Sequence, residues 1–189
     1  MKKSILALTS AVLVLSSAFA FAGCGGAQSS ASGQASQAAT TVAATEAQKD
    51  ASAVTAQDVQ FVYNGVTIEL NSDAADLTEK LGQPNDVQSQ MSCHGEGEDK
   101  TYFYNGFTVN TYPASDGKER ITEVVVTDAS LATAKGVVVG DAVSKVTETY
   151  GSNYKQQGKY YSYSAGDKKS LQFFIDNDKV TEIDYFYEV

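Results

Sequence analysis

Apolar and polar residues alternate along the last two thirds of the chain, in short runs separated by turn residues. Segments 60–70 (QFVYNGVTIEL) and 101–112 (TYFYNGFTVNTY) each place Asn-Gly between two such runs. Asn-Gly suits a two-residue hairpin turn, in which both central residues need a positive φ, so both segments predict β-hairpins. An Asp-Gly pair at 116–117 and an Asn-Asp pair at 177–178 predict turns before two further strands, RITEVV and KVTEID.

Two short segments have helical spacing instead. In NSDAADLTEKLGQP (71–84), the apolar residues at positions 74, 77 and 81 share one face, and the glycine and proline at the end stop the helix. In GDAVSKVTETYG (140–151), positions 143, 146 and 150 share a face and Gly151 closes the helix. The two segments are built alike.

The likeness continues beyond the helices. The first is followed by a polar loop and then TYFY, FTVNTY and RITEVV, and the second by a polar loop and then YSY, LQFFID and KVTEID. We therefore predict an α+β domain at 58–189, a two-layer antiparallel sheet that begins with a β-hairpin. It would contain two tandem repeats, at about 66–128 and 136–189, each with one short helix and three antiparallel strands. Two unrelated α+β halves are the alternative.

The first 57 residues have a different character. Lys2 and Lys3 precede an apolar run at 5–21, which is typical of a signal peptide at 1–23, although an uncleaved anchor helix would have a similar length. Residues 24–57 are mostly Ala, Ser, Gly, Thr and Gln and contain no aromatic residue. Such a segment cannot bury enough apolar surface to offset its conformational entropy, so it predicts a disordered tether.

The cleavage point decides whether the mature protein is anchored. Two overlapping A-x-A sites, at 18–20 and 20–22, fit ordinary cleavage and free secretion. However, FAGC at 21–24 resembles the lipobox of bacterial lipoproteins, with phenylalanine where leucine is usual. This resemblance implies diacylglyceryl attachment to Cys24, cleavage before it, and a lipid anchor at the extracytoplasmic face of the cell membrane.

The folded part has a resemblance of its own. A helix ending in LGQP, then a loop and antiparallel strands, together with the opening GVVVGDAVSKVTETYG, resembles the SmpA/OmlA and β-lactamase-inhibitor-protein-like (BLIP-like) group. The PepSY type is the alternative fold. The resemblance implies a non-catalytic module that binds a protein or another cell-envelope ligand through an exposed sheet, without a cofactor.

Charge and motifs agree with this expectation. The formal net charge is −9 and becomes more negative once the two leader lysines are removed, which argues against a nucleic-acid partner. The chain has one histidine and lacks a Gly-x-Ser-x-Gly elbow, a phosphate loop and a Cys-x-x-Cys pair, so no enzyme class is indicated. Hydrolysis by carboxylates stays an alternative.

Tyrosine supplies the first candidate binding site. The chain has 11 tyrosines. Tyr161 and Tyr163 share one face of their predicted strand, and Tyr185 and Tyr187 share one face of theirs. Amphipathic rings suit protein contacts, so we expect these four residues to form an exposed patch, with packing inside the sheet as the alternative.

The segment MSCHGEGEDK (91–100) supplies the second candidate. It holds the metal-capable residues Cys93, His94, Glu96, Glu98 and Asp99, and its glycines would let the chain fold around an ion. This loop, expected between the first helix and the first strand of repeat one, is the basis of an alternative metal- or redox-handling function. If Cys24 carries lipid, Cys93 has no disulfide partner in the chain.

Overall fold

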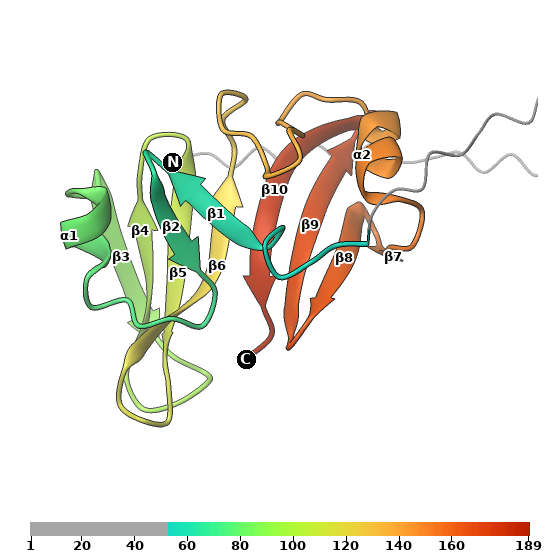
Figure 1. Cartoon of the computed structure of the whole chain (residues 1–189). Coiled ribbons are helices and arrows are strands. Elements are labelled where there is room, and N and C mark those ends of the chain that lie inside the picture. The colour runs from blue at the N-terminus through green and yellow to red at the C-terminus, as the bar shows by residue number, and fades with distance from the viewer. Residues whose placement is uncertain (1–52) are drawn as a thin grey trace, which may run out of the picture. The chain divides into compact units, whose positions relative to one another are not determined.

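A computed structural model describes residues 53–189. Most of this part is antiparallel sheet, arranged as one eight-stranded sheet and one two-stranded hairpin with two short helices (Figure 1). The elements are β1 (Gln60–Tyr63), β2 (Val66–Glu69), α1 (Leu77–Leu81), β3 (Asp86–Met91), β4 (Glu98–Phe103), β5 (Phe107–Pro113), β6 (Glu119–Val126), α2 (Val143–Tyr150), β7 (Lys155–Gln157), β8 (Tyr160–Gly166), β9 (Lys169–Asp176) and β10 (Lys179–Tyr187). The predicted leader, Cys24 and nearly all of the predicted tether lie outside the described residues.

The predicted turns join neighbouring strands. Asn64 and Gly65, with φ of 49° and 79°, connect β1 to β2. Asn177 and Asp178, with φ of 49° and 60°, connect β9 to β10. Two consecutive positive φ values match the right-handed twist of the strands they connect, which explains why these residue pairs occupy the turns.

The main sheet has the strand order β3-β4-β5-β6-β10-β9-β8-β7, with every neighbouring pair antiparallel. Each helix is followed by four strands, so the expectation of three strands after each helix is wrong. The additional strands are β3 and β7, both of which lie in segments expected to be polar loops. All their residues are exposed, so they lack the alternation of apolar residues that marks a half-buried strand.

One hydrophobic core lies between one face of this sheet and the smaller elements. The β1–β2 hairpin lies across the front of the sheet in Figure 1, and its Phe61 ring is 5.0 Å from Phe107 and 5.6 Å from Tyr185. Leu77 of α1 and Tyr150 of α2 belong to the same core. The Tyr150 ring is tilted against the rings of Tyr163 on β8 and Phe173 on β9, at 5.6 and 5.4 Å between centroids. Within residues 53–189, every element outside the sheet therefore packs on the same face, and the opposite face has no covering helix or strand.

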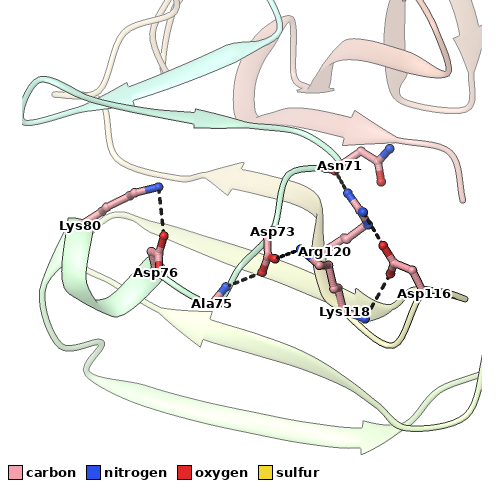
Figure 2. A network of polar contacts seen from close by, with 8 residues as sticks. All are labelled: Asn71, Asp73, Ala75, Asp76, Lys80, Asp116, Lys118 and Arg120. Carbon is pink, nitrogen blue, oxygen red and sulfur yellow. Dashed lines mark hydrogen bonds and ion pairs between the residues drawn. The ribbon is translucent and has the colours of Figure 1, made fainter.

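Polar contacts fasten the segment before α1 to the edge of β6 (Figure 2). β10 pairs only with the second half of β6, and an isolated bridge between Asp73 and Arg120 continues the pairing in the first half. Arg120 donates to the carbonyl of Asn71 and to the carboxylate of Asp116, at 2.9 and 2.6 Å, and Lys118 donates to Asp73 at 2.8 Å. These contacts fill the free edge of the central strand.

No helix within residues 53–189 is long and apolar enough to cross a membrane.

Candidate functional site

The uncovered face of the eight-stranded sheet is the candidate site. Strand alternation directs every second side chain away from the core, so residues opposite one another on neighbouring strands form rows on this face. One row is Gln88, Thr101, Asn110, Glu123, Phe186, Ser170 and Ser164, and the next is Asp86, Phe103, Thr108, Val125, Asp184, Gln172 and Ser162. Most of these side chains are half-buried, and they combine carboxylates, amides, hydroxyls and a few aromatic rings.

Three carboxyl groups gather near the middle of this face, on the two central strands. Asp184 lies on β10 between the buried residues Ile183 and Tyr185, with Glu182 two positions before it. Glu123 lies on β6, diagonally across from Asp184, because Val125 pairs with Asp184 and Glu123 with the residue two positions later. We call Glu123, Glu182 and Asp184 the acidic cluster.

Asp184 is unusual because it is only 3% exposed although no element covers it. Burial raises the pKa of its carboxyl to about 8, and the Glu182 and Glu123 carboxyls contribute to this increase. Its Oδ1 atom has no hydrogen-bond partner among residues 53–189. At neutral pH the group therefore holds a proton in the folded protein, and one of its oxygens is free to accept a hydrogen bond.

Glu123 is held by an amide. Burial raises the pKa of Glu123, while a hydrogen bond from Asn110 opposes that increase. Asn110 Nδ2 lies 2.6 Å from Glu123 Oε2, and a carboxylate can only accept, so this contact fixes which way the amide points. Asn110 Oδ1 is then directed elsewhere, is buried, and has no partner.

Aromatic rings border the acidic cluster. The Tyr160 hydroxyl on β8 donates to Glu182 Oε1 at 3.2 Å, and its ring lies 4.8 Å from Phe174 on β9. Burial, followed by the negative charges of Asp184 and Glu182, raises the pKa of Tyr160 to about 12, so the hydroxyl remains a donor at any physiological pH. Phe186 on β10 is half-buried on the same face.

A shallow hollow of about 230 Å³ continues this face toward β3. It is lined by Gln90, His94, Asp99, Lys100, Thr101, Asn110, Thr111, Tyr112, Thr122 and Val189. Two of these residues carry buried oxygen atoms without a hydrogen-bond partner, Asp99 Oδ1 and Asn110 Oδ1. Because Asn110 also holds Glu123, the hollow and the acidic cluster form one continuous polar surface.

The predicted tyrosine patch is wrong for two of its four members. Tyr163 and Tyr185 are each 2% exposed and belong to the hydrophobic core. Tyr161 and Tyr187 are half-buried, and Tyr161 stacks on Tyr154 with 4.2 Å between ring centroids. Each pair does share a strand face, but that face is directed toward the core side of the sheet, where burying large rings gains the most free energy.

The predicted metal loop is the turn between β3 and β4, and not an insertion ahead of the first strand of its half. Ser92 N donates to the Gly97 carbonyl at 3.0 Å, and the unpaired Cys93 is exposed. His94 lies with its edge toward Tyr112, at 6.4 Å between centroids. Among residues 53–189, no three His, Cys, Asp or Glu side chains lie close enough together to hold a metal ion, which leaves the Cys93, His94, Glu96 and Glu98 alternative without a ligand shell in this part of the chain.

Comparisons with known proteins assign no family. No family model and no curated protein matches the chain. Among solved structures, an extracellular protein containing an SCP domain from Bacillus anthracis has a TM-score of 0.44 at 14% identity, over 63% of this chain and 44% of that one. The uncharacterized protein YfeY from Escherichia coli has a TM-score of 0.40 at 15% identity, over 64% and 92%. The DUF4309 family protein YjgB from Bacillus subtilis has a TM-score of 0.43 at 15% identity, over 70% and 90%. This chain thus spans less than half of the first protein, and similarity at this level carries no inference about function.

Proposed function

We propose that this chain is a lipoprotein that is anchored through Cys24 at the extracytoplasmic face of the cell membrane and binds a protein partner through the uncovered sheet face. The lysine-led apolar leader and the FAGC sequence support the anchor. The small-residue segment that follows supports a tether, which would let a folded domain reach partners away from the lipid. Lipid would provide the membrane affinity, because an acidic chain gains none from anionic headgroups.

The single observation that carries the binding proposal is the half-buried, hydrogen-bond-deficient character of the uncovered face. Nearly all buried polar atoms in folded proteins have a partner. On this face, buried oxygens of Asp99, Asn110 and Asp184 have no hydrogen-bond partner in the described part of the chain. A partner that covers the sheet and donates hydrogen bonds to these atoms would remove this deficit.

Binding fits this face better than catalysis. His94 is the only histidine of the chain. It lines the hollow beside the β3–β4 turn, and the acidic cluster itself consists of carboxyl groups without an imidazole. A sheet face of eight strands with one shallow hollow resembles the surfaces through which proteins contact one another more than the deep concave pockets that enclose small substrates.

The internal symmetry of the domain belongs to the same proposal. We infer that the halves α1–β6 and α2–β10 are tandem repeats of the SmpA/OmlA and BLIP-like kind, now with four strands each. Their common element order supports this, as does a strand order that is mirrored about the β6–β10 pair. Both helices also end at a glycine with φ near 85°, Gly82 and Gly151.

Site-specific photo-crosslinking in intact cells tests the binding proposal. A photoreactive phenylalanine analogue is placed in the full-length protein at Thr101 or Gln172 on the uncovered face. Matched controls carry it at Thr67 of β2 or Glu79 of α1, which are exposed on the other side of the sheet. We expect a discrete protein adduct from the first two positions and none from the controls. Adducts of equal yield from all four positions, or from the controls alone, would refute the proposal.

A further inference from the structure

We propose that the uncovered face recognises basic side chains of its protein partner, with arginine guanidinium or lysine ammonium groups seated on the acidic cluster Glu123, Glu182 and Asp184 and on the neighbouring acceptors Asp99 and Asn110. This inference rests on the proposed function, because it names the chemistry of the partner at the same face.

The acidic cluster has no ion-pair partner within residues 53–189. The ion pairs within residues 53–189 involve other carboxylates, and none of them includes Glu123, Glu182 or Asp184. The groups that face Asp184 from the adjacent strands are Glu123 on β6 and Gln172 on β9, and the Tyr160 hydroxyl follows on β8, one strand further away. None of these three groups is basic. A cationic partner would therefore meet a group of carboxyls for which residues 53–189 supply no basic partner.

The hydrogen bonds that this face lacks within residues 53–189 all require a donor. Four buried side-chain atoms in the described part of the chain lack a partner, and three of them lie on this face: Asp99 Oδ1, Asn110 Oδ1 and Asp184 Oδ1. All three are acceptors, so their complement must donate. Arginine and lysine side chains have only donors, and a guanidinium has five N–H groups, whereas an anionic ligand would add acceptors to a surface that already has too many.

The composition and width of this face suit an organic cation with several charged groups. A metal ion does not fit, because residues 53–189 contain no group of three close ligands. Tyr160 and Phe186 border the carboxylates, and aromatic faces attract organic cations. The neighbouring Phe174 ring already has Lys159 Nζ over it, 5.7 Å from the ring centroid. The acceptors extend from β4 to β10, three strand spacings or about 14 Å, which is too far for one side chain but suits a peptide with several basic residues.

Proton release is a consequence of this arrangement. The Asp184 carboxyl, whose pKa burial raises to about 8, holds a proton in the free protein at pH 7. A bound cation favours the carboxylate, so the proton passes to solvent when the complex forms. Affinity should therefore increase as the pH rises from 6 to 8, in contrast to binding through carboxylates that are already ionised in this range.

The experiment measures binding of a peptide with alternating glycine and arginine to the full-length protein in a non-ionic detergent, by isothermal titration calorimetry. We expect the wild-type protein to bind the peptide at pH 7.5. The affinity should be at least tenfold weaker for the Glu123→Gln or Asp184→Asn variant than for the wild type. Glu148→Gln, which removes an exposed charge on α2, should change the affinity for the peptide less than twofold. The same peptide with neutral citrulline should bind at least tenfold more weakly. Equal binding of the citrulline peptide, or an equal loss with Glu148→Gln, would overturn the inference.

Two further measurements separate the outcomes. Spermidine that binds as tightly as the arginine peptide would show a site for small polycations and overturn the assignment to a protein segment. The crosslinks from Thr101 and Gln172 are then repeated in the Glu123→Gln variant. If they persist unchanged, the inference fails and the proposed function stays intact. If the wild-type protein itself gives no such crosslinks, the proposed function is refuted. Circular dichroism confirms that each variant is folded, and Glu182→Gln replaces any variant that is not.

Discussion

Replacing Asp184 with asparagine is expected to raise the free energy of unfolding at pH 7, because the native fold keeps this carboxyl away from water. The side chain is 3% exposed, and its pKa is raised from 3.8 to about 8, first by burial and then by the nearby Glu182 and Glu123 carboxyls. An asparagine has nearly the same shape and no charge to desolvate. Its amide can also donate to Glu182, as the protonated Asp184 carboxyl does.

The size of the effect follows from the difference in proton affinity. Each pKa unit corresponds to about 1.4 kcal/mol. The pKa of Asp184 is higher in the folded than in the unfolded chain. The contribution of this group to the free energy of unfolding is therefore greatest below pH 3.8 and decreases as the pH rises toward 8. Above pH 8 it no longer changes with pH. Between pH 5 and pH 7 the unfolded chain is ionised and the folded chain is protonated, so the wild type should lose about 3 kcal/mol over this interval through Asp184.

Urea unfolding of the full-length chain, followed by circular dichroism at pH 5, 6 and 7, measures this loss. The stability difference between Asp184→Asn and the wild type should grow by about 3 kcal/mol from pH 5 to pH 7. Glu148→Gln serves as the matched control, since an exposed helix carboxylate should leave the pH dependence unchanged. Parallel pH profiles for Asp184→Asn and the wild type would refute the account of a buried, protonated Asp184.

Three further changes probe other parts of the account. Cys24→Ser should abolish incorporation of labelled palmitate and release the protein from the detergent phase, and label retained by the variant would contradict lipidation. Phe61→Ala should lower the free energy of unfolding by about 3–5 kcal/mol, because this ring is 2% exposed between the hairpin and the sheet. Val62→Ala, at a position 56% exposed, should lower the free energy of unfolding by only about 0.5 kcal/mol. Equal losses for Phe61→Ala and Val62→Ala in urea unfolding would argue against the packing of the hairpin on the sheet. Gly82→Ala should lower the free energy of unfolding by about 1 kcal/mol in the same assay. The reason is the φ of +85° at this position, since a Cβ there would meet no atom within 4 Å. An unchanged urea midpoint would contradict this helix ending.

The turns and the strands with a buried face were predictable, while two edge strands were not. Asn64-Gly65 and Asn177-Asp178 have a local conformational preference that does not depend on the rest of the fold. β3 and β7 are edge strands with every residue exposed. Their pairing depends on neighbours that are distant in space from the core, so the hydrophobic pattern contains no trace of them.

The candidate site was missed for a related reason. Alternation indicates that Tyr185 and Tyr187 share a face, but it does not tell which face of the sheet will be covered. The same alternation placed Glu182 and Asp184 together on the opposite face, where charged residues are ordinary. Only the three-dimensional packing reveals that Asp184 is buried there with an unpartnered oxygen.

Hydroxyl-radical footprinting of the full-length protein, in intact cells and after purification, tests the central claim most directly. The measured quantity is the oxidation of Phe174 and Phe186 on the uncovered face, compared with that of Val62 and Met91, which are 56% and 78% exposed elsewhere. If a partner covers this face, both phenylalanines will be protected in cells, while Val62 and Met91 will be oxidised equally in the two samples. Equal oxidation of the phenylalanines in both samples, or protection confined to Val62 and Met91, would contradict the assignment of this face as the binding surface.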